Sequence, residues 1–234
     1  MRLGIMQPYF LPYIGYFQLF EHCDTFVVYD DIKYTKRGWI NRNRILASGQ
    51  PRTITLPLRR ASDFADVRDR EIAPEFSASQ TFAILRQSYH KAPYWANYEQ
   101  LLKEVLEFPN HNLFDFVANS ISAVAACLGI KTELVISSSL GIDRSLRGEE
   151  RVLATCAAIG ATEYVNPIGG LDLYHEAAFT ERGLRLSFLR SRLTPYAQFS
   201  FPYVEALSVV DTMMFVEPLE LRSRVQSDFE IITR

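Results

Sequence analysis

The first thirty residues contain the pattern that most restricts how this chain can fold. Leu3–Met6 is a short apolar run typical of a buried strand, and Thr25–Tyr29 is a β-branched and aromatic run typical of a central strand. Between them, the prolines and glycine of Gln7–Gly15 predict a loop, and Tyr16–His22 offers one or two helical turns. Strand, loop, helix and strand together form a βαβ unit, which closes onto a parallel sheet.

The second half of the chain continues this alternation. Helical patterns and apolar strand patterns follow one another over Asn112–Leu128, Thr132–Ser137, Gly148–Ile159, Thr162–Asn166, Leu173–Arg182 and Leu184–Leu189. Arg52–Leu58 alternates like a strand, and Pro218 begins a polar tail. We therefore predict one α/β domain over residues 1–234, with a mostly parallel Rossmann-like sheet flanked by helices and a helical insertion at about residues 59–110.

The composition excludes several classes of protein. The chain has 25 Lys and Arg against 27 Asp and Glu, so it has no overall field to hold a nucleic-acid backbone, and we expect no nucleic-acid partner. Three cysteines without metal-ligand spacing are typical of a reduced, cytoplasmic protein. No run of about 18 apolar residues is present, so we expect no membrane span.

Polar residues collect where the predicted strands end. In open α/β sheets, ligands bind beyond the carboxyl ends of the strands. These ends are Gln7, Asp30–Asp31, Ser137–Ser139 and Asn166–Gly170. In the last of them, Gly169 and Gly170 permit either a close approach of the backbone to a ligand or an ordinary turn. The ends of the strands are therefore the first place to expect a binding site.

The loop after the first strand is one candidate site. A helix start near Gly15 can present backbone N–H groups to an anion, and the tyrosines of the loop can stack on a sugar or a base. Gln7 is a polar amide directly after an apolar strand and needs a partner. The alternative is a proline-rich turn whose rings pack in the core. The expected binding residues are Gln7, Pro8, Tyr9, Tyr13, Gly15 and Tyr16.

The next strand end offers carboxylates. Adjacent aspartates, here Asp30 and Asp31, can hold Mg²⁺, bind sugar hydroxyls or act as a general base. Because neighbours in a strand point to opposite faces, we expect one of the two to enter the site. We take both as candidate catalytic residues, and two residues alone are too few to predict a metal centre.

A basic and aromatic stretch follows the aspartates. Five cations lie within twelve residues, from Lys33 to Arg44, and could clamp phosphate, with Trp39 as a stacking surface. The alternative is a solvated basic loop paired with nearby acidic residues. The expected substrate-binding residues here are Arg37, Trp39, Asn41, Arg42 and Asn43.

His90 is the second candidate base. It follows a helical pattern and sits in the polar, aromatic stretch Tyr89–Tyr94, where Tyr89 is a further candidate for substrate contact. Asn166, Gly169 and Gly170 complete the expected contacts. The sequence contains no HExxH motif, no Cys/His ligand set, no Gly-x-Ser-x-Gly elbow and no Walker A loop, so we expect no structural zinc site.

Several of these stretches together match a known family. The chain resembles the WbqC-like family over nearly its whole length, in Gln7–Phe17, Asp30–Asp31, Trp39–Asn43, Tyr89–Tyr94, Tyr164–Gly170, Pro195–Gln198 and Leu207–Asp211. More distantly, the first βαβ unit resembles nucleotidyl-transferring α/β folds, with Pro12–Gly15 where those have His-x-Gly-His.

The family resemblance implies a bacterial protein associated with O-antigen and surface-polysaccharide clusters. It implies a transferase that adds an amino-acid or other acyl group to a nucleotide-linked amino sugar. It carries over no catalytic residue. The alternative is a non-catalytic protein of the same pathway that binds the sugar or the nucleotide.

Overall fold

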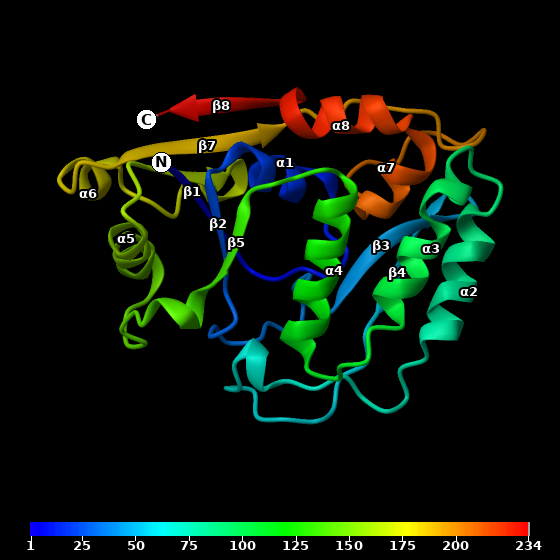
Figure 1. Ribbon diagram of the computed structural model, residues 1–234, viewed down its shortest axis with the longest axis horizontal. Coiled ribbons are helices and arrows are strands. Elements are labelled where there is room, and N and C mark those ends of the chain that lie inside the picture. Colours follow the sequence, from blue (N-terminus) through cyan, green and yellow to red (C-terminus); the bar gives the residue numbers. More distant parts are fainter. Residues whose placement is uncertain (234) are drawn as a thin grey trace.

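The computed structural model describes residues 1–233, and its centre is a six-stranded sheet (Figure 1). The strand order is β5-β2-β1-β6-β7-β8. All neighbours pair in parallel except β7 and β8, which are antiparallel. The strands are β1 (Arg2–Met6), β2 (Thr25–Val28), β5 (Glu133–Ile136), β6 (Glu163–Pro167), β7 (Arg185–Ser191) and β8 (Phe229–Thr233). The predicted α/β class with a mostly parallel sheet is confirmed.

Helices cover both faces of this sheet. Two buried clusters result, because successive residues of a central strand point to opposite faces. Phe26 of β2 belongs to the larger cluster, with residues of α1 (Ile14–His22), α4 (Leu113–Cys127), α7 (Val209–Phe215) and α8 (Pro218–Ser227). Val27, the next residue, belongs to the smaller cluster, with residues of α5 (Gly148–Ile159) and α6 (Glu176–Thr180). Both faces are therefore closed to solvent at the centre of the sheet.

Helix boundaries follow local signals in the sequence. The Asn112 side chain caps α4 by accepting from the backbone N–H of Asp115 at 3.1 Å. Helix α5 spans the predicted Gly148–Ile159 and ends at Gly160, which has a positive φ of 73°. Ser208 caps α7 through the N–H of Val210 at 3.3 Å. These caps explain why the predicted helices agree with the observed ones to within a few residues.

The middle of the chain differs from the prediction in its first part. Helices α2 (Ala78–Tyr89) and α3 (Trp95–Leu106) lie within the expected insertion, but a hairpin of β3 (Arg42–Ala47) and β4 (Gln50–Thr55) precedes them. The strand predicted at Arg52–Leu58 is β4, shifted by two residues. The sequence of β3 shows no apolar and polar alternation, because the polar Asn43 shares the buried face with Ile45, so no strand was expected there.

The C-terminal segment is another correction. Pro218 begins helix α8, which is followed by strand β8, so this segment is not an irregular polar tail. Proline at the first helical position is a regular helix-start signal. No helix within residues 1–233 combines the length and the apolar character needed to cross a bilayer.

Candidate functional site

A cavity of about 540 Å³ lies at the carboxyl ends of β1 and β6. From β1 the chain builds the sheet on one side with β2 and β5, then crosses to the other side of β1 to form β6. The loops after β1 and β6 therefore diverge, and this point of divergence is where open α/β sheets bind ligands. We call this space the switch-point cavity. Gln7, Tyr9, Tyr13, Trp39, Asn166, Gly169 and Gly170 are the residues of the predicted site that line it.

Two amide side chains of this cavity have unused hydrogen-bonding groups. Asn166 accepts from the hydroxyl of Tyr164 at 3.2 Å through Oδ1, and within residues 1–233 nothing accepts from its Nδ2. The Gln7 side chain likewise makes no hydrogen bond in the described part of the chain. Gly170 lies so close to Asn166 that an added Cβ would stand 1.8 Å from Nδ2, which explains the glycine here. The amides are thus available to a ligand.

A second cavity of about 420 Å³ adjoins the first, and the two share Tyr29, Ile32, Lys33 and Tyr174 in their walls. We call it the cationic cavity because Lys33, Arg144, Arg147 and Arg151 line it. The three arginines were not among the predicted site residues. In the sequence, these arginines lie close together from Arg144 to Arg151, at the start of a predicted helix. Only the tertiary structure brings this segment close to β2.

The two adjacent aspartates take different positions, as expected. Asp30 accepts from the Ser137 hydroxyl at 2.8 Å and from the N–H of Ser138 at 2.9 Å, and does not line either cavity. Asp31 lines the cationic cavity, accepts from Ser137 and forms a buried ion pair with Arg151. The Asp31 carboxyl therefore faces the cleft formed by the two cavities.

The ion pair keeps Asp31 charged. Burial opposes ionisation, but the Ser137 hydroxyl and the Arg151 guanidinium outweigh it, so that the pKa of Asp31 lies below its usual value. Tyr29 beside it stays neutral, because burial raises its pKa to about 12 against the opposing effect of Arg151. The cleft therefore holds an ionised but weakly basic carboxylate.

His90 lies outside the cleft. It is exposed at the end of α2, where its Nδ1 is 2.9 Å from the carbonyl oxygen of Arg86. It lines neither cavity, so the structure does not bring this predicted base together with Asp31.

Part of the basic stretch also lies outside the cleft: Arg37 and Arg42 line neither cavity, whereas Lys33 lines both and Trp39 lines the switch-point cavity. Arg42 donates to the carbonyls of Gly38 at 3.0 Å and Arg37 at 2.6 Å, so its guanidinium stabilises a turn. Arg37 is exposed and lines neither cavity. Arg44 lies over Trp39 at 5.5 Å from the ring centroid and lines a hollow of about 170 Å³ that shares Tyr9, Tyr13 and Trp39 with the switch-point cavity.

The remaining predicted residues support the site from behind. Asn43 donates to the carbonyls of Phe10 at 3.0 Å and Leu11 at 2.8 Å, which holds the first loop in place. The Tyr16 hydroxyl donates to the Gln7 carbonyl at 3.1 Å. Four more are buried or packed against neighbours: Pro8, Gly15 under the Tyr13 ring, Asn41 bonded to Tyr34, and Tyr89 bonded to Asp211.

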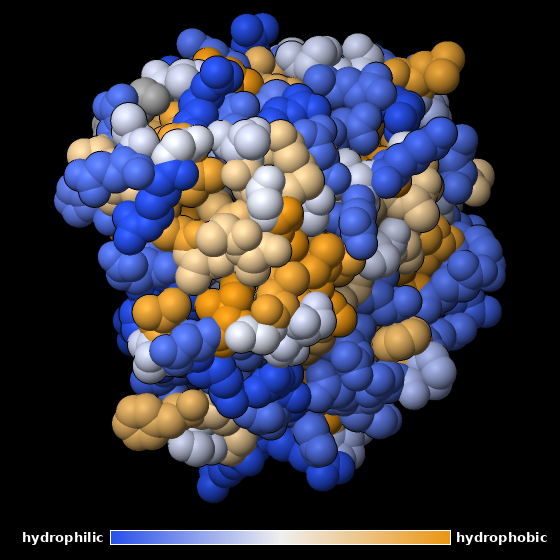
Figure 2. Space-filling model, turned by 60° about the vertical axis from the view of Figure 1, so that its left-hand side comes forward, coloured by the Kyte–Doolittle hydropathy of each residue, from blue (hydrophilic) through white to orange (hydrophobic). Residues whose placement is uncertain are grey.

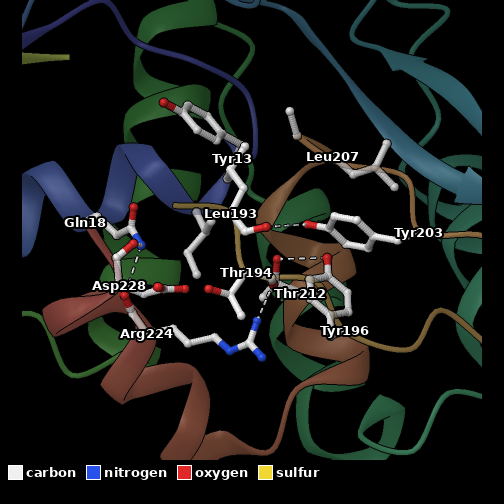
Figure 3. Close-up of a pocket in the computed structure, with 12 residues that line it drawn as sticks. Tyr13, Gln18, Leu193, Thr194, Tyr196, Tyr203, Leu207, Thr212, Arg224 and Asp228 are labelled. Atoms are coloured by element: carbon white, nitrogen blue, oxygen red, sulfur yellow. Dashed lines mark hydrogen bonds between the residues drawn. The ribbon is translucent and has the colours of Figure 1, made fainter. Parts of the chain in front are cut away.

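A fourth hollow, between α1, α7 and α8, is too small for a substrate (Figure 3). It holds about 10 Å³, roughly the space of one water molecule. Several of its polar groups are bonded to one another, as Tyr203 is to the Leu193 carbonyl at 3.4 Å and Arg224 to the Thr194 carbonyl at 2.6 Å, while the buried Oε1 of Gln18 has no partner within residues 1–233. This hollow therefore belongs to the packing of the C-terminal helices.

A further space of about 470 Å³ lies on the outer surface between α2 and α3, lined by Ser79, Phe82, Ala96, Glu99, Gln100, Lys103 and Glu107. Figure 2 brings the α5 and α6 side forward and shows apolar residues gathered in the middle of this face, with hydrophilic residues around them. Within residues 1–233, no three His, Cys, Asp or Glu side chains are placed to share a metal ion.

The fold and the cleft define an α/β protein with a polar cleft where its sheet changes direction. The profile of the WbqC-like protein family matches residues 7–223, and the chain belongs to this family. It is 30% identical over 218 residues to the uncharacterized protein Rv1507c of Mycobacterium tuberculosis, a match that covers 92% of this chain and 94% of the relative. No solved structure matches the chain.

Proposed function

We propose that this protein is a cytoplasmic transferase of bacterial surface-polysaccharide or O-antigen biosynthesis. In this proposal it adds an amino-acid or other acyl group to a nucleotide-linked amino sugar in the switch-point cavity. The observation that carries the proposal is the pair of unused amides, Gln7 and Asn166, which line one cavity with the rings of Tyr9, Tyr13 and Trp39. Amides that pair with hydroxyls and rings that cover apolar sugar faces are the groups that sugar recognition needs.

Each group then has a role. Gln7 and Asn166 hydrogen-bond to the hydroxyl or amide groups of the sugar and fix its orientation. Asp31 accepts a hydrogen bond from a hydroxyl or amine of the acceptor in the cationic cavity. Because the pKa of Asp31 is lowered, this carboxylate orients the acceptor and takes up a proton only weakly.

Calorimetric titration with nucleotide sugars, combined with an acyl-transfer assay, tests the proposal. Replacing Asn166 by Ala should weaken sugar binding about tenfold or more, because each hydrogen bond lost at a buried polar contact costs about 1–1.5 kcal/mol. Asn97→Ala on α3 is the matched control, since Asn97 is exposed and does not line the switch-point cavity. Absence of binding for nucleotide sugars, nucleotides and acyl donors alike would contradict the proposal.

One observation favours the alternative of a non-catalytic binding protein. The carboxylates that line the two cavities, Asp31 and Asp66, are both engaged in ion pairs with arginines, and no histidine lines either space. Such a protein needs no proton transfer. Asp31→Asn, like Asp30→Asn and His90→Ala, would then leave its function unchanged, and a tightly bound nucleotide sugar would be recovered without turnover.

A further inference from the structure

We infer that the phosphate part of the ligand binds in the cationic cavity, between Lys33, Arg147 and Arg151 at the N-terminus of α5. The ligand class is a phosphate or diphosphate ester whose ring extends into the switch-point cavity. This inference deepens the proposed function and rests on it for the identity of the group beyond the phosphate. It keeps Lys33 from the cluster Lys33–Arg44 that the sequence suggested as a phosphate clamp, and leaves out Arg37 and Arg42, which line neither cavity.

The charges of the cationic cavity do not balance. Four cations and two carboxylates line it, which leaves a surplus of two positive charges. Arg144 pairs with Asp66 and Arg151 pairs with Asp31. Among the described residues, no ion pair engages the remaining two cations: Lys33 lies over the Phe64 ring, and Arg147 donates to the backbone carbonyls of Arg144 and Leu146, which leaves both charges without a carboxylate. A phosphate ester carries up to about two negative charges at neutral pH and would match this surplus.

Arg151 gives the cavity a fixed donor. Its side chain is only 8% exposed and lies over the Tyr29 ring, 4.9 Å from the centroid. The pair with Asp31 uses its terminal nitrogens, while its Nε has no hydrogen-bond partner. A buried donor without an acceptor is unfavourable. A small shift of the guanidinium toward an oxygen-rich anion would give the Arg151 Nε–H group a hydrogen-bond acceptor.

The start of α5 adds backbone donors. This helix is twelve residues long, and its N-cap residue, Arg147, makes no side-chain cap, so the N–H groups of the first turn lack a capping side chain. Gly148, the first helical residue, lines the cavity. Both acidic residues of the first turn have other partners: Glu149 accepts from the N–H of His175 at 2.5 Å, and Glu150 pairs with Arg182 at 3.6 Å. The positive end of the helix is thus open to an anion.

The shared walls allow one ligand to occupy both cavities. Tyr29 and Tyr174 line the boundary, and Lys33 stands at it as well. At the rim of the cationic cavity Phe64 is 80% exposed, with the Lys33 ammonium 4.6 Å from its ring centroid. A phosphate held by Lys33 and Arg147 would therefore lie next to the amides of the switch-point cavity. A sugar phosphate and a nucleoside diphosphate both have this chemistry.

Calorimetric titration with pyrophosphate, a nucleoside diphosphate, a sugar 1-phosphate and the unphosphorylated amino sugar tests the inference. We expect the phosphorylated probes to bind and to weaken steeply as salt is raised. Lys33→Gln and Arg147→Gln should each reduce their affinity about tenfold or more, without a change in thermal stability. Arg52→Gln on β4 removes an exposed arginine far from the cleft lining and should change nothing.

Different results would overturn the phosphate site and the transferase function. If the Lys33→Gln, Arg147→Gln double variant binds all phosphorylated probes like the wild type, or if the wild type binds none of them, the phosphate site is overturned. If phosphorylated probes bind through these residues but no acyl donor is consumed with a nucleotide sugar, the transferase is overturned and the phosphate site stands. Preference for the nucleoside diphosphate over the sugar 1-phosphate identifies the nucleotide as the source of the phosphate.

Discussion

Two buried carboxylates, Asp31 at the cleft and Asp211 on α7, lie in opposite electrostatic environments. Asp31 is 6% exposed and pairs with Arg151, and its pKa is lowered. Asp211 is fully buried and accepts from Tyr89 at 2.9 Å, Tyr196 at 2.7 Å and Gln198 at 2.6 Å. Burial raises the pKa of Asp211 in spite of these three donors. Neutral donors therefore do not replace a cation in stabilising a buried negative charge.

The two environments also have different consequences for the fold. The Asp31 pair lies at the end of β2, where it keeps a charge at the surface of the cleft. Asp211 lines neither cavity and joins three segments that are distant in sequence: the end of α2, the stretch Pro195–Gln198 and α7. All three belong to the stretches that resemble the family. We infer that their shared pattern preserves a structural connection rather than ligand contacts.

The largest expected effect is on the Asp31 pair. Arg151→Met leaves the Asp31 carboxylate buried without its cation and should lower the free energy of unfolding by about 3–5 kcal/mol. Adding Asp31→Asn removes the unpaired charge and should restore most of the loss. Urea unfolding of both variants measures this, and equal stability of the single and the double variant would contradict the role assigned to the pair.

A smaller effect is expected at Asp211. Tyr89→Phe removes one donor to Asp211 and also the oxygen that accepts from the backbone N–H of Leu46 at 2.8 Å. Leaving that buried N–H unsatisfied should cost about 1–3 kcal/mol. Tyr203→Phe is the control, since its hydroxyl makes a longer bond of 3.4 Å to a partly buried carbonyl. A larger loss in the control than in Tyr89→Phe would show that Asp211 is not the centre of this network.

The contributions of Asp31 and Asp211 to stability change with pH in opposite directions. The stability that Asp31 contributes is present above its unfolded pKa, about 3.9, and is lost as the pH falls through its lower folded pKa. For Asp211 the folded pKa is raised, so its contribution is present below the unfolded value and is lost as the pH rises through the folded pKa.

Asp211→Asn should therefore flatten the pH dependence of stability above about pH 4. The wild type should lose up to about 1.4 kcal/mol per pH unit more than the variant in this range, because one proton is released on unfolding there. Urea unfolding from pH 3 to pH 8 measures both slopes. Parallel curves above pH 4 would mean that Asp211 is ionised in the folded state as readily as in the unfolded chain.

The smallest effect on stability is expected for an exposed ion pair between an arginine and a carboxylate. Arg190 and Glu230 lie 3.4 Å apart across β7 and β8, and both side chains are 52% exposed. Water and salt screen such a pair, so Arg190→Ser should change stability by at most about 1 kcal/mol. A loss as large as that of Arg151→Met would show that burial is not what distinguishes the Asp31 pair.

Local signals in the sequence determined the fold class, the strand ends and several helix boundaries. Leu3–Met6 and Thr25–Tyr29 predicted the parallel sheet because a strand that is covered on both faces must be apolar on both. Asn112 and Gly160 marked helix ends because caps act within a few residues. Since ligands bind at strand ends in such sheets, the sequence predicted Gln7 and Asn166 at one edge of the sheet, and both line the switch-point cavity.

Only the tertiary structure decided which charged groups face the cleft. Arg42 and Arg151 are the same residue type, yet Arg42 donates to carbonyls four and five residues away, while Arg151 meets Asp31 across 120 residues of sequence. Likewise Tyr89 reaches Asp211 over 122 residues. Such partners depend on how helices and strands pack, and a long side chain binds whichever acceptor the packing brings near. The local sequence therefore determined where a site would form, and the packing of distant elements determined its charge.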